Sequence, residues 1–341
     1  MTAHPLLSGA AMFEQVTPPP RSVRSEERET FWTCARSDER TVVLAGLGAE
    51  VLYLRATEQG AQLEASWKYF AMGDRAHTRR LVAHVATGNL VHARSDGDLV
   101  VTTRHASRRL ARLDAAVLDA AVVEESWSVL GACEDGSLHH IDLETGERTG
   151  AYRAPAGTAF ESLACEPRHR TVALFDRAGA LHLVDTATMA RFELREGIGR
   201  PRRARWLSSS RLVIASGGEL LLYDTLHGTC DAVVGPLSGV IEDFDWDLQG
   251  RQLAVLTSDG ALSLYDLGTF APLRRASLGL ARPRGVAWLS FQKADPSLRM
   301  LIAFGSTGAI ERAVVHQGTL QPAGRMHLPF TPSTTSDLGL L

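Results

Sequence analysis

The sequence predicts an all-β protein, a seven-bladed β-propeller in which four-stranded antiparallel sheets surround a central axis. The first observation is the stretch LAVLTSDGALSLYD at 253–266, an apolar strand, a Ser-Asp-Gly turn and an alternating strand. An Asp-Gly pair between two such strands indicates a β-hairpin, because glycine accepts the positive φ that the turn requires. The second observation is that this hairpin recurs along the chain. The turn glycines are separated by roughly 39 to 49 residues, the period of a four-stranded propeller blade.

A third observation comes from the tryptophans of the last three blades. The seven turn glycines are Gly48, Gly97, Gly136, Gly179, Gly218, Gly260 and Gly308. Trp206, Trp246 and Trp288 recur once per blade in the predicted first strands. An Arg-Pro-Arg triplet precedes the first and the last of them at the same offset. An aromatic residue at one fixed place in each blade fits wedge packing between radial sheets, so we expect a structural role.

The predicted blades divide the chain as follows. A tail over 1–28 contains a proline run, the propeller covers 29–330, and a polar tail covers 331–341. The approximate blades are 29–75, 76–120, 121–158, 159–198, 199–239, 240–281 and 282–330. Six or eight blades are the alternatives, because the first two are the least regular, and 61–70 reads as a strand or a short helix. We expect every blade to supply its own four strands. Ring closure then rests on packing of blade one against blade seven, with or without an added N-terminal strand.

Composition narrows the classes of function. The chain has 45% hydrophobic and 22% charged residues and a net charge of −3, which favours neither nucleic acid nor an anionic membrane. No apolar run approaches the ~20 residues that span a bilayer, and the first residues do not resemble a secretory signal. The four cysteines lie far apart in the sequence. We therefore expect a soluble, reduced, cytoplasmic protein without membrane insertion.

The segment WDLQGRQLAVLTSDGALSLYDLGTF at 246–270 resembles one repeat of the WD40 and related seven-bladed β-propeller superfamily. The chain departs from that pattern because no blade has the Gly-His pair. The terminal Trp-Asp is replaced by Ile141-Asp142, Val184-Asp185, Tyr223-Asp224 and Tyr265-Asp266. The resemblance implies a rigid, non-enzymatic platform that holds partner proteins on its faces. We therefore expect a protein-interaction scaffold or adaptor subunit of a larger assembly, with no cofactor.

The alternative function is an enzyme or a ligand-binding protein with its site in the mouth of the central channel. No H-x-x-x-H, G-x-S-x-G or Walker-type motif occurs, so we expect no catalytic residue and no metal site. His139 and His140 would point to opposite faces of one strand. Asp243, Asp245 and Asp247 alternate along a predicted first strand. They form either an acidic channel wall that attracts a cation or a hydrogen-bonded face.

The predicted binding surface follows from propeller topology. The hairpin turns and the links between blades lie on the same face. That face collects the turn carboxylates Asp96, Asp135, Glu219 and Asp259 and the link arginines Arg75, Arg79, Arg80, Arg200, Arg202, Arg203, Arg282 and Arg284. These arginines either bind an acidic segment of a partner protein or solvate the loops and pair with neighbouring carboxylates. The lack of aromatic residues among them argues against nucleic acid.

Overall fold

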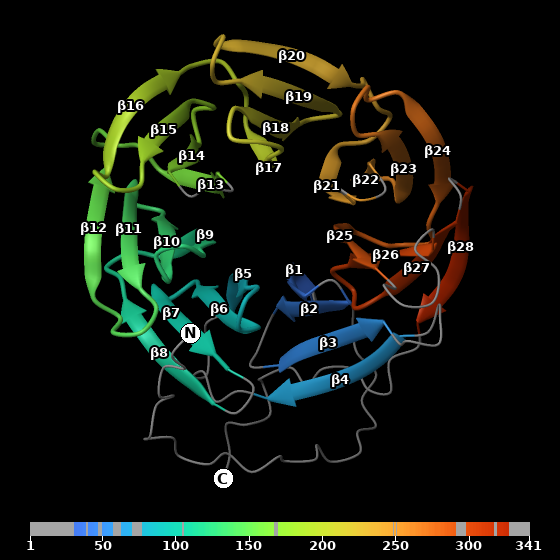
Figure 1. The fold of residues 1–341 in the computed structure, drawn as a ribbon, viewed down its shortest axis with the longest axis horizontal. Helices are drawn as coiled ribbons and strands as arrows, with labels where there is room; N and C mark the ends of the chain where they lie inside the picture. Colours follow the sequence, from blue (N-terminus) through green and yellow to red (C-terminus); the bar gives the residue numbers. More distant parts are fainter. Residues whose placement is uncertain are drawn as a thin grey trace.

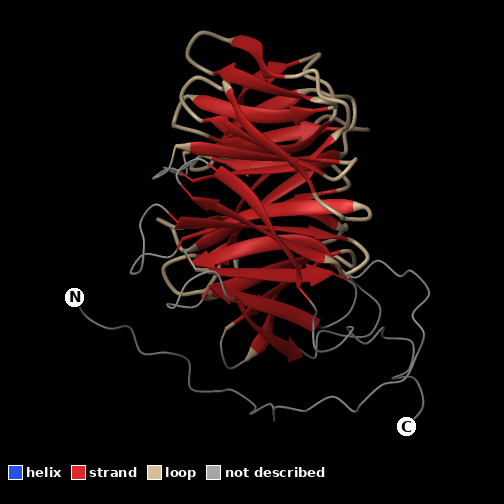
Figure 2. Cartoon of the chain, turned by 90° about the vertical axis from the view of Figure 1, so that its right-hand side faces the viewer, coloured by secondary structure: helices blue, strands red, loops and turns tan. Residues whose placement is uncertain are grey.

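The protein is a ring of seven sheets. The computed structural model describes residues 31–38, 40–46, 50–56, 63–69, 77–103, 106–166, 170–247, 249, 251–290, 298–316 and 319–326. Within these ranges the strands β1 to β28 form seven four-stranded antiparallel sheets, each built from four consecutive strands. The sheets stand around a central axis (Figure 1), and the edge-on view shows a disc with loops on both faces (Figure 2). The predicted fold and the count of seven blades are confirmed.

Each blade runs from the centre of the ring to its rim. The innermost strands are β1 (Phe31–Asp38), β5 (Thr78–His84), β9 (Val117–Val123), β13 (Phe160–Cys165), β17 (Pro201–Trp206), β21 (Ile241–Asp247) and β25 (Pro283–Ser290). The second strands are β2 (Thr41–Gly46), β6 (Asn89–Arg94), β10 (Ser128–Cys133), β14 (Thr171–Asp176), β18 (Arg211–Ser216), β22 (Gln252–Thr257) and β26 (Leu298–Gly305).

The third and fourth strands complete each sheet. The third strands are β3 (Glu50–Ala56), β7 (Asp98–Thr102), β11 (Ser137–Asp142), β15 (Leu181–Asp185), β19 (Glu219–Asp224), β23 (Ala261–Asp266) and β27 (Ile310–His316). The fourth strands, at the rim, are β4 (Leu63–Tyr69), β8 (Ser107–Arg112), β12 (Arg148–Arg153), β16 (Ala190–Arg195), β20 (Thr229–Val234), β24 (Pro272–Ser277) and β28 (Thr319–Met326). The segment that read as a strand or a helix is therefore the strand β4.

The core lies in the seams between neighbouring blades. In β2, Val42 and Leu44 pack toward blade seven, whereas Val43 and Ala45 pack toward blade two. Successive side chains of a strand point to opposite faces, so a strand covered on both sides reads as a continuous apolar run. Seven clusters of buried hydrophobic residues, one for each seam, follow this rule in the described residues. The rim strand β16, by contrast, is mostly exposed.

A β-bulge recurs at one position of every inner strand. In β21, Ile241 pairs with Thr257 and Asp243 pairs with Leu256, so that Glu242 is the extra residue. The equivalent extra residues are Trp32, Arg79, Leu118, Glu161, Arg202, Glu242 and Arg284. A bulge bends a strand and redirects its side chains. It therefore fixes which residues of each blade face the centre of the ring.

Ring closure uses packing alone among the described residues. The sheet of blade one contains only β1 to β4, and the sheet of blade seven contains only β25 to β28. One seam cluster, which includes Leu44, Leu54, Ile302 and Phe304, joins these two blades. The predicted packing of blade one against blade seven is confirmed. The tails over 1–28 and 331–341 lie outside the described residues.

Two of the repeated tryptophans link neighbouring inner strands. Trp206 Nε1 donates to the Ala164 carbonyl of blade four (2.9 Å), and Trp288 Nε1 donates to the Asp245 carbonyl of blade six (3.1 Å). Trp246 packs partly buried against the seam between blades five and six. The predicted structural role of the tryptophans is confirmed.

Candidate functional site

The hairpin turns and the links between blades are fastened together on one face of the disc, which we call the turn face. In blade six, the Ser258 N–H donates to the Val240 carbonyl of the incoming link (2.8 Å). The Leu278 N–H of the outgoing link donates to the Gly260 carbonyl of the turn (2.8 Å). Blade two repeats both bonds. The predicted sharing of one face is confirmed, and these loops form a stiff base for the side chains they carry.

The predicted arginines lie deeper in the blades than the sequence suggested. We expected all of them in links, but five lie at the start of inner strands: Arg79 and Arg80 in β5, Arg202 and Arg203 in β17, and Arg284 in β25. Arg200 and Arg282 do lie in links, and Arg75 is outside the described residues. The bulge explains the difference. Because of the bulge, each of these strands begins with polar residues, whereas hydrophobic alternation predicts that the strand begins a few residues later.

The turn carboxylates do not join the predicted arginines in one cluster. Three of them pair with another arginine of their own blade: Asp96 with Arg94 (3.2 Å), Asp135 with Arg153 (2.6 Å) and Asp259 with Arg275 (3.7 Å). Glu219 is half-buried at the start of β19. These carboxylates therefore belong to separate contacts on separate blades.

Four predicted arginines meet carboxylates of the inner strands. The pairs are Arg80 with Asp119 (3.0 Å), Arg200 with Glu161 (2.6 Å), Arg202 with Glu242 (2.8 Å) and Arg203 with Asp243 (3.5 Å). Arg200 and Arg202 keep 62% and 46% of their side chains exposed, so a further anion still reaches them. Solvent screens such exposed pairs, and each contributes little to stability.

Arginines from two blades converge on Glu242, whose side chain is only 8% exposed. Burial raises the pKa of Glu242, and the charges of Arg202, Arg284 and Arg203 oppose that rise. Arg202 and Arg203 come from blade five and Arg284 from blade seven, on either side of the blade that carries Glu242. The last arginine of each Arg-Pro-Arg triplet, Arg202 or Arg284, thus brings positive charge to one buried carboxylate.

The alternating aspartates of β21 fasten blade six to blade seven. Asp243 Oδ2 accepts the Val286 N–H (3.1 Å), and Asp245 Oδ2 accepts the Trp288 N–H (3.0 Å). Asp247 Oδ2 pairs with Arg299 Nε (2.8 Å) and Asp247 Oδ1 accepts the Gln249 N–H. All three side chains are therefore engaged inside the protein. This is the hydrogen-bonded face, one of the two interpretations that the sequence left open.

Three arginines of the inner strands, Arg80, Arg203 and Arg205, form what we call the inner arginine cluster. Arg205 Nη1 lies 3.3 Å from Asp245 and its Nη2 lies 3.5 Å from Asp243. Burial lowers the pKa of Arg205, but Asp245 and Asp243 outweigh it, so the pKa is raised and the side chain stays charged. Sequence reasoning did not select Arg205. Aligning the first strands of the blades with one another could have identified it, because it lies two residues after Arg203.

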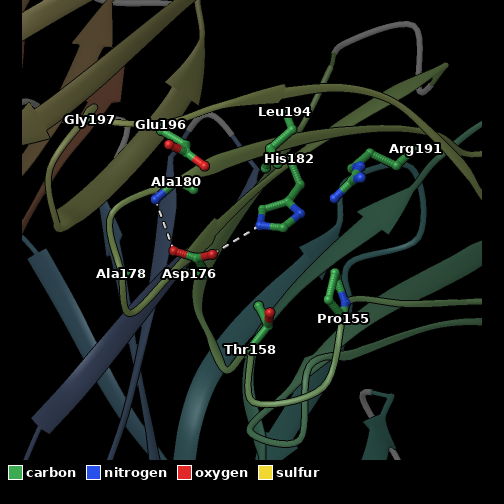
Figure 3. Close-up of a pocket in the computed structure, with 10 residues that line it drawn as sticks. All are labelled: Pro155, Thr158, Asp176, Ala178, Ala180, His182, Arg191, Leu194, Glu196 and Gly197. Carbon is green, nitrogen blue, oxygen red and sulfur yellow. Dashed lines mark hydrogen bonds and ion pairs between the residues drawn. The ribbon is translucent and has the colours of Figure 1, made fainter.

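A pocket of about 390 Å³ opens on the turn face at blade four (Figure 3). Inside it, His182 Nε2 lies 3.0 Å from Asp176 Oδ2, and Asp176 Oδ1 accepts the Ala180 N–H. The Tyr152 hydroxyl of blade three lies 3.3 Å from His182 Nδ1, and the ring of Phe160 packs edge-on against the imidazole. Both ring nitrogens have partners and the imidazole is buried. The His182–Asp176 pair thus forms a polar contact between blades three and four through Tyr152. The sequence analysis did not identify it.

Other candidate ligands are dispersed. His139 Nε2 contacts the Ser137 hydroxyl (2.9 Å) and His140 Nε2 contacts the Ser128 hydroxyl (2.5 Å). Among the residues that the structure describes, no group of three or more His, Cys, Asp or Glu side chains is arranged to hold a metal ion. In the same part of the chain, no helix is long and apolar enough to cross a bilayer.

Comparison with known proteins gives a likeness in structure only. No family model and no curated protein matches the sequence. Among solved structures, the chain is similar to the crystal structure of the WD40 beta propeller domain of Doa1, with a TM-score of 0.67. The alignment covers 86% of this chain and 94% of that one at 11% identity. The chain therefore has a WD40-like, seven-bladed propeller fold.

The fold of this chain recurs widely, since 1765 chains of solved structures match it. A fold that recurs so widely supports many unrelated functions, so function has to be argued from side chains. In this propeller the side chains that gather are the arginines around Glu242 and the inner arginine cluster.

Proposed function

We propose that this WD40-like propeller is a non-enzymatic scaffold, an adaptor subunit that binds partner proteins of the cytoplasm on its turn face. The partner presents an acidic segment to the arginines of blades five to seven. Propellers of this class commonly hold other proteins. No nucleic acid and no cofactor are part of the proposal.

The ion pair of Arg202 with the buried Glu242 (2.8 Å), beside the positive charge of Arg284 from blade seven, carries this proposal. Arg202 keeps 46% of its side chain exposed while it pairs with Glu242, so a further anion still reaches its guanidinium group. Arginine forks bind carboxylates in a two-pronged geometry, so an acidic segment is the complementary partner. Arg200 and Arg282, both exposed, extend the same patch along the links.

Charge reversal of Arg200, Arg202, Arg282 and Arg284 to Glu tests the proposal. We expect the quadruple variant to lose affinity for a glutamate-rich peptide by at least about tenfold, measured by fluorescence anisotropy. It should also lose the proteins that co-purify with the wild-type chain. The loss should diminish in high salt, because exposed charge pairs are screened.

The matched control reverses four exposed arginines of rim strands, Arg109, Arg148, Arg195 and Arg274. It changes the net charge by the same amount but leaves the turn face intact. Circular dichroism and urea unfolding establish that both variants are folded. Equal peptide affinity in the two quadruple variants would reject the turn face as the binding surface.

A further inference from the structure

The inner arginine cluster holds hydrogen-bond donors that no described residue of the protein accepts. Arg80 approaches Asp119 through Nε (3.0 Å), and Arg203 approaches Asp243 through Nε (3.5 Å). Within the described part of the chain, the two terminal nitrogens of either guanidinium have no hydrogen-bond acceptor. Arg205 Nε is buried and also lacks an acceptor there. The fork with which arginine binds oxyanions is therefore open on Arg80 and on Arg203.

The neighbouring carboxylates cannot turn to fill these forks, because they fasten the blades together. Asp119 Oδ2 accepts the Leu163 N–H of blade four (2.9 Å), and Asp119 Oδ1 accepts the Ala120 N–H (2.9 Å). Asp243 Oδ2 accepts the Val286 N–H of blade seven (3.1 Å). Rotating either carboxylate would leave a buried backbone N–H without an acceptor, which destabilises the fold.

The two open forks come from distant parts of the ring. Arg80 lies on β5 and Arg203 on β17, strands that face each other across the centre (Figure 1). Burial lowers the pKa of Arg80, and the nearby positive charge of Arg203 lowers it further. Each side chain keeps 19% of its surface exposed, so small solutes reach the guanidinium groups. Like charges held together in this way attract an anion between them.

We propose that the centre of the ring is an oxyanion site, in which one carboxylate or phosphate group binds between the forks of Arg80 and Arg203 beside Arg205. The inference goes beyond the scaffold function, because a free oxyanion fills this site as well as one carried by a partner chain. None of the four arginines reversed in the scaffold test belongs to it. The two proposals therefore fail or succeed separately.

Titration of the full chain with inorganic phosphate and with acetate, at ionic strength matched with chloride, tests the site. Either anion should raise the thermal unfolding midpoint of the wild type in a saturable way. Arg80→Gln and Arg203→Gln should each weaken phosphate binding about ten- to a hundredfold, as expected for loss of charged hydrogen bonds. Arg177→Gln is the control, because Arg177 is an exposed turn-face arginine paired with Glu134. It should bind phosphate like the wild type.

Arginine side-chain NMR of the wild type detects binding without any variant, so it also tests the site where a variant unfolds. Phosphate should shift the Nε–H signals of Arg80, Arg203 and Arg205 and leave that of Arg177 in place. A response to acetate as well as phosphate shows that a carboxylate is sufficient, and a response to phosphate alone assigns the site to phosphate groups. Unshifted signals of the inner arginine cluster, or equal stabilisation of all three glutamine variants, would overturn the proposal.

Discussion

His92 shows how a polar side chain is fitted into the core of a blade. It is fully buried, and its Nδ1 lies 3.2 Å from the Thr78 hydroxyl of the neighbouring strand. Burial, followed by the positive charge of Arg94, lowers the pKa of His92 to about 3. The imidazole is therefore neutral in the folded protein at any pH near neutrality.

His92 gives a pH dependence of stability with a definite sign. In the unfolded chain a histidine binds a proton below a pH of about 6.5, whereas folded His92 resists protonation down to about 3. The unfolded state thus binds more protons in this window. The contribution of His92 to stability is complete above the window and is lost on acidification, by up to about 1.4 kcal/mol per pH unit.

Urea unfolding across this window, compared with His92→Gln, measures the effect. Glutamine keeps a hydrogen-bonding side chain but does not titrate there. The variant should therefore show a shallower fall in stability on acidification, by about one proton. Identical slopes for the two proteins would assign the acid sensitivity to other groups.

Individual residues were predictable from the sequence where the repeat is visible. Trp206 and Trp288 stand at one place in their blades, and both bridge neighbouring blades as expected. The inner arginine cluster was not predictable. Arg80 and Arg203 lie far apart in the chain, and only the closed ring brings their charges together. Which atoms of each guanidinium remain open is likewise decided by the hydrogen bonds of Asp119 and Asp243.

At the scale of the element, the hairpin turns are tightly enclosed. Gly136 has a φ of +77°, and a Cβ at this position would collide with the Thr158 carbonyl oxygen of the adjoining link. Gly157 has a φ of +88°, but a Cβ there would meet nothing within 4 Å. The two glycines share a left-handed backbone and differ in the space around them.

Alanine at each glycine separates the two effects. Gly157→Ala should cost only the backbone strain, about 1 kcal/mol. Gly136→Ala should cost at least about 1 kcal/mol more, because the link must also move away from the turn. Urea unfolding gives both values. Equal losses of unfolding free energy in the two variants would mean that the link moves away from the turn without destabilising the protein.

The hairpins were the elements that the sequence predicted best, since an Asp-Gly turn between apolar strands leaves few alternatives. The starts of the inner strands were predicted least well. β5 begins at Thr78, in the polar run Thr78-Arg79-Arg80, before the apolar alternation that marks the strand. The bulge accommodates this run in the sheet, and hydrophobic periodicity alone does not reveal it.

At the scale of the whole molecule, the described residues close the ring at the seam between blades one and seven without a shared strand. Phe304 is 1% exposed in that seam, and Phe175 is fully buried in the seam between blades four and five. Either change to alanine should cost about 3–5 kcal/mol, because it removes a large side chain from a packed core.

The two variants should differ in where the ring opens. In Phe304→Ala, hydrogen exchange should lose protection first in blades one and seven, since the described residues of these two blades share no strand and meet through side-chain packing. In Phe175→Ala, the chain itself connects the weakened blades, so exchange should rise there without separating the ends. The same exchange pattern in both variants would show that the closing seam is no weaker than the others.

The seven bulges place one extra residue at the equivalent position of each inner strand, beside the centre of the ring. These residues differ in charge and size, yet every surrounding sheet keeps the same register. The side chains at these seven positions therefore vary independently of the packing between sheets that stabilises the ring. Substituting the side chains at these seven positions alone would change which ligand the centre of the ring binds and would leave the fold the same.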